Sequence, residues 1–227
     1  MAKKTNKTDE QFAAVEETLG RTEQWVENNQ QLLSKIVFTI IGIIAIVLSY
    51  NNFYLDPLNE EANGELFASV NYFEKDSFNI ALNGDGQYLS LLEVIEDYSS
   101  TDAGNLAQYY AGICYLKLGD NENAIYHLNK FNASDEIVST VALGGIADAH
   151  ANLGEVDKAI SFWKKAASKS DNKFTAPLYM KRAALALEEN GDLSTALKLY
   201  QNIKDNYSSS DEGLDIDKYI TRASLMQ

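Results

Sequence analysis

The sequence has one cysteine, two histidines and no glycine-rich phosphate loop, and these shortages limit the chemistry it can perform. A single cysteine cannot form a disulfide within the chain, and Cys114 lies in an apolar helical stretch, where we expect a buried packing residue. His127 and His150 have neither a carboxylate nor a cysteine at metal-ligand spacing. Asn83–Gly86 has neither the preceding strand nor the lysine of a phosphate loop. We therefore predict a protein that is not an enzyme, with no catalytic residues, metal or cofactor.

Basic residues are also scarce. The chain has 19 Lys and Arg against 33 Asp and Glu, a net charge of −14. Residues 51–227 hold 14 basic and 27 acidic residues, so −13 of that charge lies there. Nucleic-acid binding depends largely on neutralising phosphates, so this composition argues against a nucleic-acid partner.

A long apolar run is present near the N-terminus. Ile36–Tyr50 contains no charged residue, and apolar residues on both sides extend it to a predicted transmembrane helix over residues 34–55. The preceding segment is long and rich in acids, and no small-residue cleavage site follows the run. These features exclude a cleaved signal peptide, so we expect an anchor with one pass through the lipid bilayer.

The basic residues near this segment predict its orientation. Nothing basic follows the uncharged run Ile36–Tyr50 until Lys75, whereas five basic residues precede that run: Lys3, Lys4, Lys7, Arg21 and Lys35. Positive residues stay on the cytoplasmic side, which places the N-terminus in the cytoplasm and the larger C-terminal part in the periplasm of a bacterial inner membrane. Residues 1–33 form a partly helical cytoplasmic leader, either a simple lead-in to the span or a docking helix on a membrane complex.

The rest of the chain repeats itself. A glycine is followed five residues later by an alanine three times, at intervals of about 34 residues, which is typical of stacked helical hairpins. The pairs are Gly119/Ala124, Gly154/Ala159 and Gly191/Ala196. The glycine ends one helix, and the alanine lets the next helix pack closely. The three predicted hairpins are Leu106–Leu118 with Glu122–Phe131, Ile137–Leu153 with Val156–Ala167, and Pro177–Glu189 with Leu193–Ile203.

These positions resemble the tetratricopeptide repeat. The resemblance implies an all-α fold: a single N-terminal transmembrane helix, then a helical solenoid with a C-terminal capping helix. We expect a helical region with a degenerate first repeat over 56–104, three repeats over 105–207, and the capping helix over 208–227. Such an array presents a surface to partner proteins.

In this repeat family, the first helix of each hairpin lines a concave groove. The corresponding residues are Leu106, Tyr109, Ile113, Leu116, Val141, Asp148, Lys181 and Leu185, with Gly144 and Leu178 at equivalent positions. An apolar groove of this kind could bind a partner helix or a non-native segment, unless neighbouring elements cover it. Repeat proteins that hold a chaperone's terminal carboxylate carry a Lys/Asn pair where this chain has Tyr109 and Ile113, so we exclude that use.

The whole layout resembles the YfgM-like ancillary subunits of the SecYEG translocon, in a form typical of Bacteroidetes. The resemblance rests on the leader and span, with Trp25–Asn29, and on the blocks Ala103–Gly119, Phe162–Lys169 and Asp215–Ala223. It implies an accessory subunit that binds a PpiD-like membrane-anchored periplasmic chaperone and meets secreted client proteins as they emerge.

Two other protein-binding roles are compatible with the sequence. One is a membrane-anchored periplasmic scaffold for envelope assembly or cell division, which has the same architecture. The other is an organelle receptor with cytosolic repeats, against which the missing carboxylate-binding pair and the basic residues before the span both argue.

Overall fold

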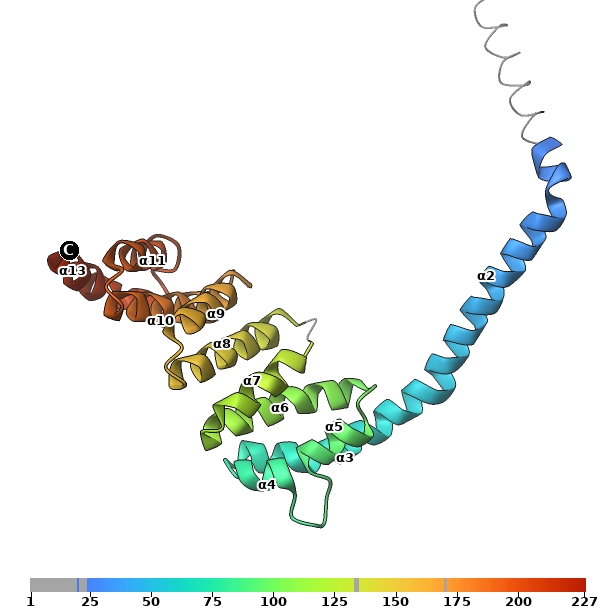
Figure 1. Ribbon diagram of the computed structural model, residues 1–227, viewed down its shortest axis with the longest axis horizontal. Helices are drawn as coiled ribbons and strands as arrows, with labels where there is room; N and C mark the ends of the chain where they lie inside the picture. The colour runs from blue at the N-terminus through green and yellow to red at the C-terminus, as the bar shows by residue number, and fades with distance from the viewer. Residues whose placement is uncertain (1–19, 21–23, 133–134, 170) are drawn as a thin grey trace, which may run out of the picture. The chain divides into compact units, whose positions relative to one another are not determined.

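The computed structural model of the chain describes residues 20, 24–132, 135–169 and 171–227. The chain divides into two compact units, Met1–Asp56 and Pro57–Gln227. Within the described residues, every regular element is a helix, which confirms the predicted all-α fold (Figure 1).

The first unit contains a long apolar helix. Helix α2 (Gln30–Tyr50) continues into the π-helical segment η1 (Asn51–Leu55), and neither contains a buried residue. An 18-residue stretch reaches a mean hydropathy of 2.5. The rings of Tyr50 and Tyr54 stack with their centroids 5.2 Å apart. This helix is long and apolar enough to cross a bilayer, and its backbone polar groups are satisfied within it, as hydrocarbon requires.

Most of the leader lies outside the described residues. Those that lie outside include Phe12, Val15 and Leu19, whose spacing in the sequence predicts the apolar face of an amphipathic helix. Trp25 and Val26 are described, and both are helical and exposed.

The second unit begins with three helices: α3 (Asp56–Glu74), α4 (Phe78–Asn83) and α5 (Leu91–Asp97). The apolar residues up to Phe78 suggest one continuous helix, but the chain turns at Asp76, whose φ of 56° is left-handed. The sequence pattern after the Asn83–Gly86 turn predicts a helix over Tyr88–Tyr98, but the observed helix begins at Leu91, because Ser90 and Glu93 form a capping box. This region therefore departs from a regular hairpin.

Three hairpins follow, close to the predicted bounds. They are α6 (Asp102–Leu118) with α7 (Asn121–Lys130), α8 (Glu136–Asn152) with α9 (Val156–Lys169), and α10 (Thr175–Glu189) with α11 (Leu193–Asn206). The repeated glycines explain the turns, because Gly119, Gly154 and Gly191 have φ values of 85°, 75° and 85°. The paired alanines are fully buried, as the repeat pattern predicts.

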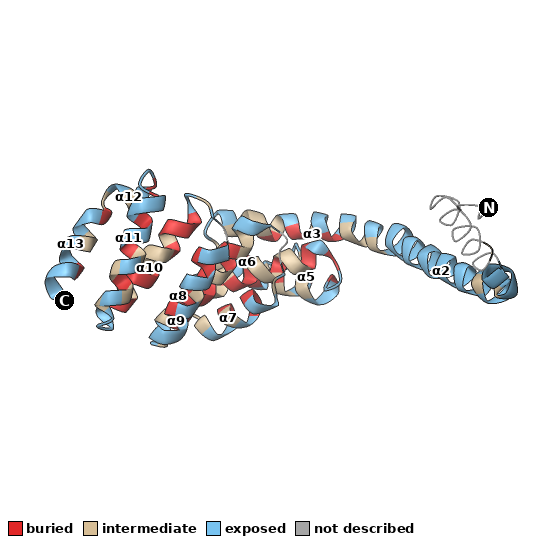
Figure 2. Cartoon of the chain, turned by 90° about the horizontal axis from the view of Figure 1, so that it is seen from above, coloured by how far each residue is buried: buried red, intermediate tan, exposed pale blue. Residues whose placement is uncertain are grey.

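The chain ends with α12 (Asp211–Leu214) and α13 (Ile216–Met226). The spacing of Ile216, Tyr219, Ile220 and Ala223 in the sequence predicts an apolar face on this last helix. Ile216 and Ala223 are buried and Tyr219 and Ile220 are half-buried, so this apolar face packs against the array. Helix α13 packs mainly against α11. Figure 2 shows that α8 and α10 consist mostly of buried and half-buried residues; their exposed residues, Glu136, Ile137, Asn152 and Glu189, lie at the helix ends.

Candidate interaction surface

The eight predicted groove residues lie on the first helix of each hairpin, and every one is half-buried. They are Leu106, Tyr109, Ile113 and Leu116 on α6, Val141 and Asp148 on α8, and Lys181 and Leu185 on α10. Side chains in this state can both support the fold and contact a partner.

Asp148 is the polar centre of this surface. Its Oδ1 accepts a hydrogen bond of 2.8 Å from the indole Nε1–H of Trp163 on α9. Its Oδ2 accepts one of 2.5 Å from the guanidinium of Arg182 on α10. Two donors from two other helices therefore fix the carboxylate in place.

Tyr179 connects this centre to the neighbouring helices. Its ring lies against Gly144, where an added Cβ would be 2.2 Å from the ring atoms. Gly144 is therefore a packing position and not part of an open wall. Burial, with smaller contributions from Asp148 and Tyr109, raises the pKa of Tyr179 to about 12 although Arg182 opposes the shift, so the phenol stays neutral at physiological pH.

Part of the apolar wall is used in packing. The ring of Tyr109 lies 5.3 Å from that of Phe131 and 5.4 Å from that of Tyr110. Ile113 and Leu116 approach Gly145 on α8, where an added Cβ would be 3.4 Å and 3.8 Å from their methyl groups. A partner can reach only the exposed part of these side chains.

A cavity of about 420 Å³ opens beside Asp148. Its lining residues come from four helices and are Leu116, Lys117, Asp148, Ala151, Asn152, Trp163 and Arg182. It contains two cations, one carboxylate and an amide, which suit polar recognition of a partner chain. Two of these residues, Leu116 and Asp148, belong to the predicted groove; the others were missed.

Lys181 belongs to a different contact. Its ammonium lies 3.3 Å from Asp215, on the approach to α13, and 4.7 Å from the centroid of the Tyr219 ring. The structure does not bring Lys181 to Asp148, although both are predicted groove residues.

The charged pairs that link successive repeats share a spacing that is visible in the sequence. Arg182 follows Asp148 by 34 residues, and two other linked pairs, Lys181 with Asp215 and Glu188 with Arg222, have the same separation. Residues one repeat apart occupy equivalent places on successive helices. Opposite charges at the repeat period are thus the signal that could have identified these contacts.

The two histidines are packing residues: His127 stacks on the ring of Tyr115 and His150 on that of Phe162. Nδ1 of His127 lies 2.8 Å from Gln108 Oε1, and Nδ1 of His150 lies 2.6 Å from Glu155 Oε2. Cys114 is buried, as predicted, and burial raises the pKa of its thiol to about 12. Among the described residues, no three His, Cys, Asp or Glu side chains are arranged to hold a metal ion.

Comparison with known proteins supports the repeat assignment. The family model of the tetratricopeptide repeat matches residues 106–134 and 180–210, which correspond to α6–α7 and α10–α11. No curated protein matches the chain. Nothing in these comparisons tests the resemblance to YfgM-like subunits, which stays a prediction.

Among solved structures, the chain is similar to the nearly identical TPR-like repeats of a Podosopora anserina protein described as a kinesin light chain. The TM-score is 0.56 at 14% identity, over 74% of this chain and 86% of that one. At this identity the likeness shows the fold alone. Two segments of the second unit therefore match the tetratricopeptide repeat, and the unit has a TPR-like fold of helical repeats, which is typical of protein-interaction scaffolds.

Proposed function

We propose that the chain is a non-enzymatic accessory subunit of the Sec translocation channel. The observation that carries this proposal is the combination of an unburied apolar helix with a protein-binding repeat array in one chain. An anchor keeps the array beside a membrane complex and raises its effective concentration for partners there. The resemblance to YfgM-like subunits supports the choice of the translocon.

The repeat array acts from the periplasmic side in this proposal. The basic residues of the leader precede the span, and none follows it until Lys75, which supports a cytoplasmic N-terminus. The array then binds a PpiD-like membrane-anchored chaperone, emerging secreted proteins, or both. Asp148, Arg182 and Lys117 at the cavity offer the polar contacts for such a partner.

Affinity purification of the tagged full chain from gently solubilised native membranes tests the proposal. The expected result is recovery of the channel subunits together with an anchored prolyl isomerase. Recovery of division or envelope-assembly proteins without the channel would support the scaffold alternative and overturn the translocon assignment.

A matched pair of variants tests whether the cavity takes part. Lys117→Glu changes an exposed lining residue, whereas Tyr109 and Ile113 pack against neighbours and are unsuitable targets. Lys130→Glu makes the same change in charge at an exposed position on α7, outside the cavity lining. We expect Lys117→Glu alone to lower recovery of the partner; equal recovery from both variants would exclude the cavity as the interface.

A further inference from the structure

Three basic side chains surround one aromatic ring where α10 meets α13. The Lys181 and Lys218 ammonium groups lie 4.7 Å and 4.9 Å from the centroid of the Tyr219 ring, and the Arg222 guanidinium lies 5.1 Å from it. Lys181 comes from α10 and the other residues from α13. We call these four residues the Tyr219 cluster; side chains from α10 and α13 meet in it.

The carboxylates that bond to the cations of this cluster are fewer than the cations. Asp215 accepts hydrogen bonds from both Lys181 and Lys218, and Glu188 accepts two from Arg222, at 2.7 Å and 2.8 Å. In these contacts, three cations meet two carboxylates. The excess of positive charge is confined to these contacts, because the neighbouring residues Glu212 and Asp217 are acidic.

Two of the three cations are open to solvent. The side chain of Lys218 is 60% exposed and that of Arg222 is 50% exposed, whereas Glu188 is only 7% exposed. The pair of Lys218 with Asp215 is exposed on both sides and therefore weak, so an incoming carboxylate can share Lys218. The exposed part of the Arg222 guanidinium can be shared while its bonds to the buried Glu188 stay in place. The half-buried ring of Tyr219 supplies apolar surface in the same region.

We infer that the Tyr219 cluster binds an acidic segment of a partner polypeptide. The inference rests on the proposed binding function and names the chemistry of the partner. An Asp or Glu carboxylate of the partner accepts hydrogen bonds from Lys218 and Arg222, and an adjacent apolar side chain of the partner lies beside the Tyr219 ring. The acidic residues near the start of α13, such as Glu212 on α12 and Asp217 on α13, repel an extended anionic surface more than they repel a single carboxylate. A polypeptide therefore fits better than an anionic bilayer.

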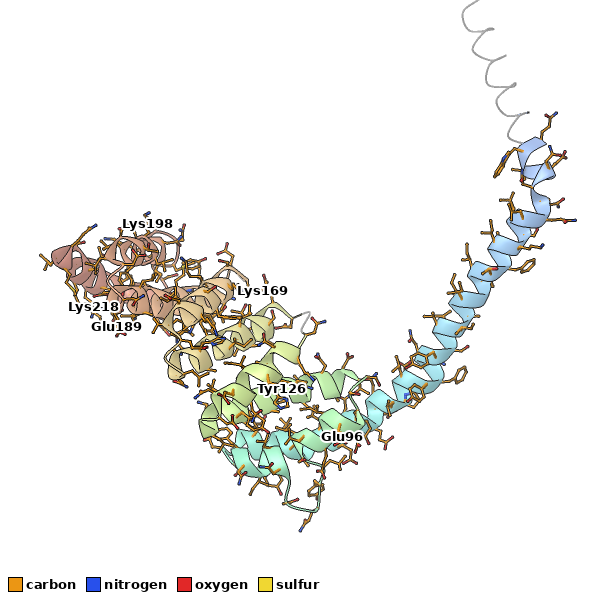
Figure 3. All side chains as sticks on the ribbon, viewed as in Figure 1. Glu96, Tyr126, Lys169, Glu189, Lys198 and Lys218 are labelled. Carbon is orange, nitrogen blue, oxygen red and sulfur yellow. The ribbon has the colours of Figure 1, made fainter. Side chains whose placement is uncertain are left out.

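The test uses the full chain in nanodiscs of neutral lipid and a labelled eight-residue peptide in which Leu and Glu alternate. Lys218→Glu should weaken binding of this peptide by about tenfold. Lys198→Glu makes the same change in net charge on α11, away from the cluster, and should change binding less than about twofold. Figure 3 labels both lysines, Lys198 on α11 and Lys218 on α13. Lys218→Arg should retain binding, because the cation remains.

Three results would overturn the inference. Equal weakening by Lys218→Glu and Lys198→Glu would indicate an effect of net charge alone. Equal binding of a control peptide that alternates Leu and Lys would exclude carboxylate recognition. Binding to phosphatidylglycerol vesicles without binding to the Leu–Glu peptide would assign the cluster to the membrane. If the wild-type chain does not bind the Leu–Glu peptide but still co-purifies with the channel, only this inference is rejected. If it binds the peptide but does not co-purify with the channel, only the translocon proposal is rejected.

Discussion

The first half of the repeat array, α3 to α7, and the second half, α8 to α13, are joined by different interactions. In the first half, aromatic rings connect helices distant in sequence: Phe73 on α3 lies 4.9 Å from Tyr110 on α6. In the second half, ion pairs connect each first helix to its successor, as between Glu188 on α10 and Arg222 on α13. Contacts between aromatic rings thus link the helices of the first half, and ion pairs link those of the second half.

The composition of the two halves explains the difference. Residues 57–132 hold twelve acidic and three basic residues, whereas residues 135–227 hold fourteen acidic and eleven basic residues. The first half has too few cations to link its helices by ion pairs, so apolar packing has to join them. Because repeats contact only their neighbours, the halves can differ in how their stability depends on salt and pH.

Each half also carries its own reporter. Cys114, the single cysteine, is buried in α6 and becomes reactive only when the first half opens. Trp163 is buried in α9, and its fluorescence reports on the second half. Replacing Trp25 by Phe removes the other tryptophan signal.

The largest effect is expected at the contact between α8 and α10. Gly144→Leu would force a side chain into the ring of Tyr179, since even a Cβ would lie 2.2 Å from it. We expect a loss of about 3 kcal/mol in the free energy of unfolding. Urea denaturation of the full chain in detergent, followed by Trp163 fluorescence, measures it.

Gly64→Ala is the matched control for this change. No heavy atom lies within 4 Å of a Cβ at Gly64, which is in the middle of α3. Alanine should stabilise that helix by about 0.5–1 kcal/mol. An unchanged unfolding midpoint in Gly144→Leu would contradict the close packing of Tyr179 on α8.

A smaller loss is expected from Arg222→Ala. The variant leaves the carboxylate of Glu188, which is 7% exposed, with only the 2.8 Å bond from the Tyr200 hydroxyl. Because an under-satisfied buried carboxylate is unfavourable, we expect a loss of about 1–2 kcal/mol. Trp163 fluorescence should show the change and the labelling rate of Cys114 should not, if the halves respond independently. Equal changes at both reporters would mean that the array unfolds as one unit.

The same pair predicts a dependence on pH. Hydrogen bonds from Arg222 hold the pKa of Glu188 below its ordinary value, which is about 4.3 for a free side chain. A depressed folded-state pKa contributes stability that is fully present above the unfolded pKa and is lost as the pH falls through the folded value. The difference between wild type and Arg222→Ala should therefore be largest at neutral pH and shrink below about pH 4. Unfolding curves at about pH 7 and about pH 3.5 measure it, and a constant difference would assign the effect to packing alone.

The sequence predicted the hairpins well because their signals are local. A glycine with positive φ at Gly119, and an alanine at a close helix contact such as Ala124, act within a few residues of their own position. The interruption at Asp76 was missed because a left-handed aspartate leaves no pattern in hydrophobic spacing.

The surface was harder to predict because it depends on which neighbour each helix face meets. Lys181 and Arg182 are adjacent in sequence, but Arg182 pairs with Asp148 on α8 while Lys181 pairs with Asp215 beside α13. An assignment by repeat position alone does not say which neighbouring helix each residue of α10 contacts. The 34-residue spacing of opposite charges would have paired Arg182 with Asp148 and Lys181 with Asp215.

The smallest effect is expected from Lys204→Ala, which tests whether ion pairs in the second half matter in general. Lys204 on α11 lies 2.7 Å from Asp217 on α13, but its side chain is 48% exposed and that of Asp217 is 74% exposed. Solvent and salt screen such a pair, and neither group depends on the other for burial. We expect no measurable change in the urea midpoint, against the clear loss in Arg222→Ala. A loss as large as that of Arg222→Ala would show that any ion pair between α11 and α13 stabilises the second half, and that the buried carboxylate of Glu188 has no special part in it.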